Sequence, residues 1–260
     1  MDNKTFSRDG TPIAYDRSGQ GPAVILVSGA MSTGGTVAPL AVPLSERYSV
    51  LVYDRRGRGK SGDTAPYAVA REVDDLAALI EAAGGEACLC GVSSGGALVL
   101  EATASGLPVR RVAVYETPFA DFLDGGAEQN AEYTEKLTTA LAEGRRGDAV
   151  ELFLRLTGMG EDMIQGARHS PMWSGMEAVA PTLAYDNSAM AGGLVPRDRL
   201  ASVAVPVLAV AGGASPEWMR EGTRAVAEAV PKGSYRVLEG QTHMVDPAAL
   251  APVLAEFFAV

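Results

Sequence analysis

The sequence predicts an α/β fold in which helices flank a mostly parallel sheet of eight strands. Short apolar runs of strand length alternate with segments of helix length over most of the 260 residues, a pattern typical of parallel sheets with helical crossovers. Between residues 118 and 199 this alternation gives way to helical stretches broken by glycine and proline. We therefore expect a core formed by residues 1–117 and 200–260, with residues 118–199 inserted after the sixth strand as a helical cap.

Each expected strand is a short apolar run or an alternating segment that ends at turn-forming residues. The eight strands are Lys4–Ser7, Pro12–Arg17, Ala23–Val27, Tyr48–Tyr53, Ala87–Cys90, Val109–Tyr115, Val205–Val210 and Tyr235–Leu238. The first two lie on either side of an Asp-Gly pair and are expected to form an antiparallel hairpin. The helices expected outside the insertion are Thr36–Glu46, Val69–Ala83, the stretch after residue 93 to about Ser105, Pro216–Val230 and Pro247–Phe258.

The composition limits the classes of partner and cofactor. A formal charge of −10 disfavours nucleic acid, anionic membranes and strongly acidic substrates. No apolar run is long enough to cross a bilayer, and no apolar signal segment follows the polar start of the chain. The two cysteines, Cys88 and Cys90, lie two positions apart in one strand, so we expect free buried thiols in a cytoplasmic protein. We expect no metal and no organic cofactor.

The strongest local signal is the segment A-C-L-C-G-V-S-S-G-G-A-L at residues 87–98. An apolar strand runs into a helix through a tight turn, with Ser93 at its apex and glycine at positions 91 and 95. Such a turn lifts the serine hydroxyl above the sheet edge and aims the first amides of the helix at it. Because G-x-S-x-G also arises by chance in a chain with 30 glycines, the prediction that Ser93 is a nucleophile depends on this context and on a partner base.

A serine hydroxyl needs a base to become a nucleophile at neutral pH, and the chain contains two histidines. His243 follows the last expected strand and therefore lies at the sheet edge that also carries Ser93. His169 lies inside the insertion. We predict His243 as the base, and His169 as an ordinary cap residue or a contact on the substrate side.

These motifs, together with the turn D-R-R-G-R-G-K-S at residues 54–61, resemble the α/β-hydrolase fold family. The resemblance covers the chain outside the insertion and is specific to the fold rather than to a substrate. It implies that the loop after the third strand contributes to an oxyanion hole, with the backbone amides of Ala30 and Ser94 as donors. Gly29 and Met31 in that loop, and Met244 beside the base, are expected to contact the substrate.

The sequence offers several candidates for the acid of the catalytic triad. Most members of the family carry an aspartate after the strand that follows the insertion, but that loop here reads G-G-A-S-P-E at residues 212–217. A second arrangement in the family places the acid at the end of the strand before the insertion, where this chain has Glu116. A glutamate that ends an apolar strand needs a partner, and His243 would supply one. We favour Glu116. The alternatives are Glu217, Asp186 and Asp246.

A narrower set of motifs resembles the fungal zearalenone lactonases, α/β-hydrolases with a Ser-Glu-His triad that open a macrocyclic lactone. The motifs are G-V-S-S-G at 91–95, Y-E-T-P at 115–118, G-A-S-P at 213–216 and S-P-M-W at 170–173. The resemblance implies Ser93, Glu116 and His243 as the triad, and Trp173 as a cap residue that binds substrate through its indole N–H. The alternative for Trp173 is helix packing inside the cap.

The sequence therefore predicts an enzyme that hydrolyses a small-molecule, largely apolar ester or lactone through an acyl-enzyme. By analogy with the fold alone, we expect a monomer or homodimer. A cofactor-free perhydrolase or haloperoxidase, a carbon–carbon bond hydrolase and a non-catalytic ligand-binding protein on the same fold are the alternatives. An adaptable lid over the serine is expected from apolar residues of the insertion. They are Met159, Met163, Met172, Trp173, Met176 and Met190.

Overall fold

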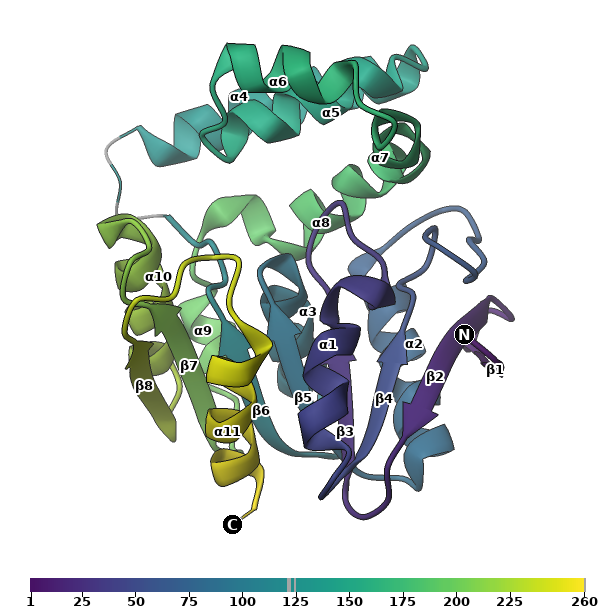
Figure 1. The fold of residues 1–260 in the computed structure, drawn as a ribbon, viewed down its shortest axis with the longest axis vertical. Helices are drawn as coiled ribbons and strands as arrows, with labels where there is room; N and C mark the ends of the chain where they lie inside the picture. The colour runs from purple at the N-terminus through teal and green to yellow at the C-terminus, as the bar shows by residue number, and fades with distance from the viewer. Residues whose placement is uncertain (121–122, 124, 260) are drawn as a thin grey trace.

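The centre of the molecule is one sheet whose strands run in the order β1-β2-β4-β3-β5-β6-β7-β8 (Figure 1). The computed structural model describes residues 1–120, 123 and 125–259. The strands are β1 (Asn3–Phe6), β2 (Pro12–Ser18), β3 (Ala23–Val27), β4 (Ser49–Tyr53), β5 (Ala87–Val92), β6 (Val109–Tyr115), β7 (Val207–Gly212) and β8 (Gly233–Leu238). β2 is antiparallel to β1 and to β4, and the remaining neighbours pair in parallel. The predicted eight-stranded, mostly parallel sheet and its N-terminal hairpin are confirmed.

Six of the eight predicted strands differ from those observed by one or two residues at one or both ends, and only β3 and β6 have the expected bounds. The causes are clearest for β7 and β8. β7 begins at Val207 rather than at residue 205, because Pro206 has no amide hydrogen to give to a sheet ladder. β8 begins two residues earlier than expected, at Gly233, and its residues are partly or fully exposed. An edge strand of this kind lacks the apolar run that identifies a buried strand.

Helices cover both faces of the sheet, each over its own apolar cluster. On one face lie α1 (Gly34–Leu44) and α11 (Pro247–Phe258). On the other lie α2 (Val69–Ala83), α3 (Ser94–Ala104), α9 (Arg197–Leu200) and α10 (Glu217–Ala229). Neighbouring strand residues point to opposite faces, so Val24 packs in one cluster and Ile25 in the other. This explains why the buried strands are uninterrupted apolar runs in the sequence.

The segment between β6 and β7 forms a helical layer above the carboxyl ends of the parallel strands (Figure 1). Its helices are α4 (Gly126–Ala142), α5 (Arg146–Leu156), α6 (Glu161–Arg168), α7 (Trp173–Val179) and α8 (Leu183–Ala189), with short 3₁₀ turns η1 (Ala180–Thr182) and η2 (Ala191–Gly193). We refer to residues 125–193 as the cap. Positions 121, 122 and 124 of the predicted insertion lie outside the described residues. No helix in the described part of the chain is both long and apolar enough to cross a membrane.

The cap has an apolar cluster of its own, separate from the two clusters of the sheet. Of the six residues expected to form a lid, Trp173 is buried in this cluster, and Met159 and Met176 pack against it. Met163 and Met172 differ from the expectation, because they are 67% and 71% exposed. Helices α6 and α7 are short, with Ile164 and Trp173 as their buried residues, and their other residues are partly or fully exposed.

Candidate active site

Ser93 lies at the apex of the turn that joins β5 to α3, with a φ of +56°. Its amide donates to the Tyr115 carbonyl oxygen at 2.9 Å, which ties the turn to the end of the neighbouring strand β6. The turn requires glycine on both sides. A Cβ at Gly91 would collide with the carbonyl oxygen of Gly95, and a Cβ at Gly95 would lie 2.5 Å from that of Val27. The observed strand–turn–helix geometry is the one that the sequence predicts for an exposed nucleophile.

The loop after β3 passes directly beside this serine. A Cβ on Gly29 would lie 2.8 Å from Ser93 Cβ and 3.4 Å from Ser93 Oγ, so only glycine leaves room for the serine side chain. Among the described residues, no backbone acceptor takes the Ala30 amide hydrogen. The amide of Ser94, as the first residue of α3, has no acceptor within its own helix. The two amides expected to form the oxyanion hole therefore belong to the loop beside Ser93 and to the residue that follows Ser93.

Glu116 and His243 come together across 127 residues of sequence. His243 Nδ1 lies 2.9 Å from Glu116 Oε2, and the backbone amide of Gly212 donates to Glu116 Oε1 at 2.7 Å. The Glu116 side chain is fully buried, whereas that of His243 is 38% exposed. Because a carboxylate accepts hydrogen bonds, Nδ1 of the imidazole carries the hydrogen and Nε2 presents its lone pair. Of the carboxylates considered, Glu116 is the one that contacts His243.

The loop that carries His243 is held against the end of β7. The Tyr115 hydroxyl donates to the Thr242 carbonyl oxygen at 2.5 Å, and the Ala214 amide donates to the Gln241 carbonyl oxygen at 2.8 Å. Any side chain at Gly212 would collide with that Gln241 oxygen. The close approach excludes an acidic side chain at position 212. The contacts of Tyr115 and Gly212 with this loop were not visible in the sequence.

The other candidates from the sequence have different surroundings. Glu217 is an exposed first residue of α10. Asp246 is the N-cap of α11 and accepts the Ala248 amide at 2.8 Å. His169 is exposed at the end of α6, where Nδ1 lies 2.7 Å from the Gln165 carbonyl oxygen. These contacts give each residue a local structural role at a helix end.

Asp186 on α8 is bound by three donors. It accepts from Ser94 Oγ at 2.7 Å, from Arg55 Nη1 at 2.7 Å and from Arg58 Nη2 at 2.6 Å. Burial on its own would raise the pKa of this carboxyl, but the charges of Arg58 and Arg55 outweigh burial and lower the pKa below its ordinary value. Asp186 is therefore an ionised partner of two arginines, and both of its oxygens are occupied by these donors.

The two cysteines are unsuited to nucleophilic chemistry. Both are free and buried in the cluster beneath α1 and α11. Burial raises the pKa of Cys88 to about 11 and that of Cys90 to about 12. A thiol with such a pKa is almost fully protonated at neutral pH.

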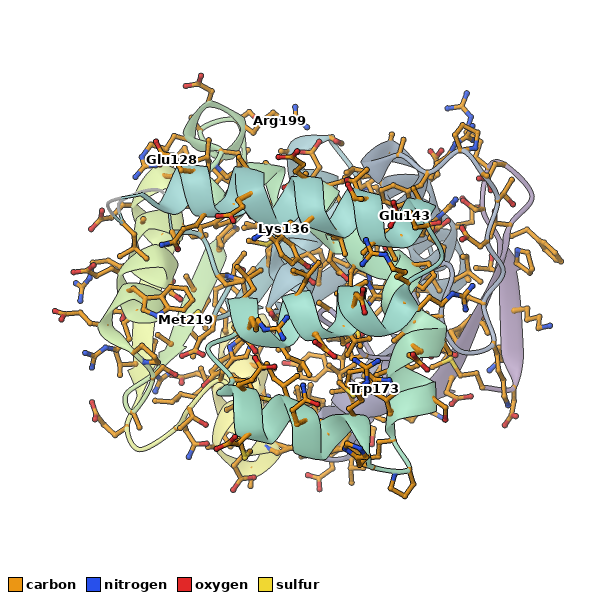
Figure 2. All side chains as sticks on the ribbon, turned by 90° about the horizontal axis from the view of Figure 1, so that it is seen from above. Glu128, Lys136, Glu143, Trp173, Arg199 and Met219 are labelled. Atoms are coloured by element: carbon orange, nitrogen blue, oxygen red, sulfur yellow. The ribbon has the colours of Figure 1, made fainter. Side chains whose placement is uncertain are left out.

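The remaining predicted contact residues are Met31, Trp173 and Met244. Met31, with a φ of +53°, and Ala30 pack against the cap cluster. Trp173 begins α7 (Figure 2) with the guanidinium carbon of Arg168 5.8 Å from the centre of its ring. Met244 is 82% exposed.

Among the described residues no hydrogen bond joins Ser93 Oγ to His243, and in unliganded enzymes such bonds are often long. The Ser93–His243 contact and the substrate contacts stay predictions.

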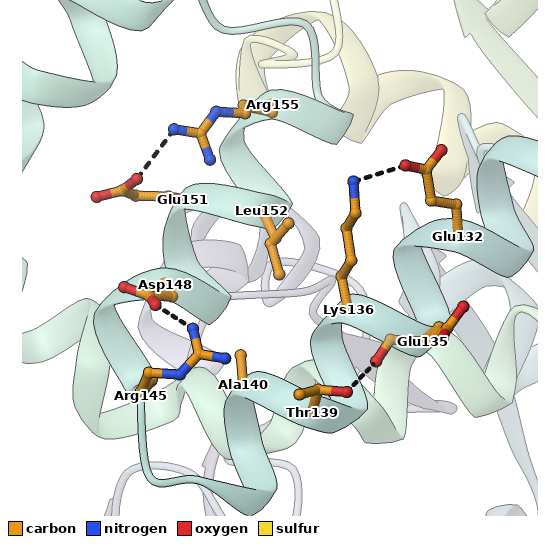
Figure 3. A pocket seen from close by; sticks show the side chains of 10 residues that line it. All are labelled: Glu132, Glu135, Lys136, Thr139, Ala140, Arg145, Asp148, Glu151, Leu152 and Arg155. Carbon is orange, nitrogen blue, oxygen red and sulfur yellow. Dashed lines mark hydrogen bonds and ion pairs between the residues drawn. The ribbon is translucent and has the colours of Figure 1, made fainter.

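Figure 3 shows a groove lined by residues of α4 and α5 and by Arg145, which precedes α5. Several of its charged residues form ion pairs. Lys136 Nζ lies 2.6 Å from Glu132 Oε1, and Arg155 Nη2 lies 2.9 Å from Glu151 Oε2. Since none of the predicted site residues lines it, we do not assign the substrate to this groove.

Comparison with known proteins decides the family. A model described as "Alpha/beta hydrolase family" matches residues 24–253. The chain belongs to the alpha/beta hydrolase family. As an alpha/beta hydrolase it is a hydrolytic enzyme, and the broad resemblance noted in its motifs is confirmed. The narrower resemblance to zearalenone lactonases stays a prediction.

Several individual proteins resemble this alpha/beta hydrolase. An alpha/beta hydrolase of known crystal structure from Sphaerobacter thermophilus is 50% identical, with a TM-score of 0.90 over 99% of this chain and 100% of that one. A pimeloyl-[acyl-carrier protein] methyl ester esterase from Xanthomonas campestris is 30% identical, over 88% of this chain and 90% of its own. The polyketide synthase ThaQ of Burkholderia thailandensis is 30% identical over 45% of this chain, which corresponds to 6% of that protein's length.

Proposed function

We propose that this hydrolase cleaves a carboxylic ester or lactone through an acyl-enzyme formed on Ser93. The observation that carries the proposal is the buried Glu116 carboxylate, 2.9 Å from Nδ1 of a partly exposed His243. This pair lies at the same edge of the sheet as the strained serine turn, and a triad needs an acid, a base and a nucleophile in that relation. Positive φ at both Ser93 and Glu116 supports a functional reason for their unusual backbone.

The proposed reaction begins when His243 Nε2 takes the proton of Ser93 Oγ as this oxygen bonds to the substrate carbonyl carbon. The carbonyl oxygen becomes an oxyanion that accepts from the amides of Ala30 and Ser94. The imidazolium, stabilised by Glu116, then gives its proton to the leaving alkoxide as the carbon–oxygen bond breaks. Water, deprotonated by His243, attacks the acyl-enzyme, and the serine leaves with that proton to regenerate the starting state.

The surroundings support a neutral, largely apolar substrate. The oxyanion loop packs through Ala30 and Met31 against the apolar cluster of the cap, and the formal net charge of −10 disfavours anionic substrates. The Xanthomonas campestris relative is named as an ester hydrolase. The resemblance at residues 170–173 implies a macrocyclic lactone as one form of this substrate, with Trp173 as its cap contact. The burial of Trp173 in the cap cluster is the feature that favours the alternative of helix packing.

A panel of esters tests this function. We expect p-nitrophenyl esters of four to eight carbons, and neutral macrolactones, to be hydrolysed with a kcat/KM at least about tenfold above that of a carboxylate-bearing ester of equal length, because an unpaired buried charge is costly. Release of p-nitrophenol or opening of the lactone is the measurement. Hydrolysis of none of these above the buffer rate would contradict the proposal and favour a binding protein on the same fold.

A further inference from the structure

Four buried charged side chains lie between the serine turn, the oxyanion loop and the cap. They are Arg55, Arg58, Glu72 and Asp186. Arg55 pairs with both oxygens of Glu72 on α2, at 2.7 and 2.8 Å. Arg55 and Arg58 both pair with Asp186. Two cations and two anions balance, but buried ion pairs are often no more stabilising than well-packed apolar residues. Their position next to the site therefore calls for a role other than stability.

Arg58 contacts the peptide unit that contains one of the expected oxyanion donors. Its Nη1 donates to the Gly29 carbonyl oxygen at 2.6 Å, and that carbonyl belongs to the same peptide unit as the amide of Ala30. In a trans peptide the C=O and the N–H point in opposite directions. Ser32 Oγ also donates to the Gly29 carbonyl oxygen, at 2.6 Å. Arg58 and Ser32 together therefore fix the direction of the Ala30 amide hydrogen, and Arg58 is the charged donor of the two. A charged donor on the carbonyl also polarises the peptide and strengthens its N–H as a donor.

The second expected donor is tied to the same network by a different contact. The Ser94 hydroxyl donates to Asp186 Oδ1 at 2.7 Å, and Arg58 Nη2 donates to Asp186 Oδ2 at 2.6 Å. One carboxylate therefore anchors both sides of the oxyanion hole. Asp186 is on α8 of the cap, whereas Ser94 and Arg58 follow β5 and β4 of the sheet. The contact links cap and core across 92 and 128 residues of sequence.

We infer that Arg58 and Asp186 are positioning residues for the oxyanion hole, and that they make transition-state stabilisation depend on the docking of α8. The inference rests on the proposed function, because it assigns the Ala30 and Ser94 amides to the oxyanion. Neither side chain touches the substrate. Arg58 orients the Gly29–Ala30 peptide unit directly, and Asp186 acts through the side chains of Ser94 and Arg58. Loss of either therefore affects the transition state more than substrate binding.

Arg56 offers a matched control from the same turn. It is as fully buried as Arg58 and is also paired, with Asp75 at 2.6 Å and Asp9 at 3.1 Å. Its other donors go to Ser7 Oγ and to the Arg71 carbonyl oxygen, so its contacts are with residues outside the oxyanion loop. Substitution of Arg56 thus removes a buried, paired guanidinium without touching the Gly29–Ala30 peptide.

The experiment compares Arg58→Met, Arg58→Lys and Asp186→Asn with Arg56→Met and Arg56→Lys. We expect Arg58→Met and Asp186→Asn to lower kcat by about 10- to 100-fold with little change in KM, below the ~10²- to 10³-fold loss from removing a donor outright. Arg58→Lys should recover part of the loss. Binding of a trifluoromethyl ketone, which forms an oxyanion on Ser93, should weaken by the same factor as kcat, while binding of the matching methyl ketone should not change.

The Arg56 variants are expected to unfold at lower temperature while their kcat stays within about threefold of wild type, because they leave both donors in place. Equal kcat in the Arg58 and Arg56 variants would overturn the inference. Losses of kcat that follow the melting temperature, or that appear in KM, would overturn it too.

Ser94→Ala tests the inference if an arginine variant does not fold. It keeps the Ser94 amide and removes one small contact to Asp186. We expect it to lower kcat several-fold and to weaken the trifluoromethyl ketone in parallel, and wild-type kcat would contradict the inference.

Different results would contradict the proposed function and the positioning role of Arg58 and Asp186. If wild-type protein hydrolyses no ester and binds no trifluoromethyl ketone, the proposed function is wrong. If wild-type protein is active but the Arg58 and Asp186 variants behave as the Arg56 variants do, only the positioning role is wrong.

Discussion

Replacing Ser93 by alanine is expected to lower kcat for a p-nitrophenyl ester by about 10⁴- to 10⁶-fold. The alanine keeps the turn between β5 and α3 and both oxyanion donors, so the residual rate reports transition-state binding without a nucleophile. The measurement is kcat at saturating ester, with thermal unfolding to show that the fold is retained. Ser105→Ala, at the other end of α3, is the matched control and should keep wild-type kcat.

A Ser93→Ala variant that keeps more than about a tenth of wild-type kcat would contradict the account, since triad nucleophiles contribute far more than tenfold. Hydrolysis would then run through another group. The two cysteines are poor candidates for that group, because burial raises the pKa of each thiol to about 11 or 12.

Replacing Glu116 by glutamine is expected to lower kcat by about 10²- to 10⁴-fold. The reason lies in the two partners of this side chain. The Gly212 amide donates to Oε1, so the amide oxygen of glutamine must take that place and its NH₂ group then faces His243 Nδ1. Two donors cannot share one hydrogen bond, so the imidazole is driven to the tautomer that carries hydrogen on Nε2. That nitrogen can no longer accept the serine proton.

Glu217→Gln is the matched control for this prediction. It makes the same chemical change at an exposed first position of α10, at the strand end where most of the family carries the acid. We expect its kcat to stay within about twofold of wild type, because an exposed carboxylate at a helix N-terminus contributes little. Near-normal kcat in Glu116→Gln, or a large loss in Glu217→Gln, would reverse the assignment of the acid.

Much of the sheet could be predicted because each buried strand is identified by residues that are adjacent in the sequence. Strands buried on both faces are continuous apolar runs, and β3 and β6 were expected with the bounds that they have. The strand ends that bear Ser93, Glu116 and His243 follow from the same pattern, because parallel strands end at one edge. The choice of Glu116 over Glu217 depended on its place at the end of an apolar strand and on the family resemblance, in which some members carry the acid there.

The features that escaped prediction depend on contacts between distant segments. The turn at residues 54–61 was recognised by its glycines, whereas the partner of Arg55 and Arg58 is Asp186, far along the chain in the cap. No local pattern marks such a pair. The absence of an acid after β7 was visible in the sequence, but the approach of the Gln241 carbonyl oxygen to Gly212, which excludes a side chain at that position, is seen only in the folded chain. The exposure of Met163 and Met172 likewise depends on how short cap helices pack.

Labelling by a fluorophosphonate probe tests most directly whether Ser93 is an activated nucleophile. The account predicts one probe per folded molecule, attached to Ser93 in the peptide identified by mass spectrometry. Labelling should be strongly reduced in Glu116→Gln and abolished in Ser93→Ala, because reaction at phosphorus needs the same base and oxyanion donors as reaction at an ester. Folded wild-type protein that stays unlabelled, or that carries the probe on a residue other than Ser93, would contradict the account.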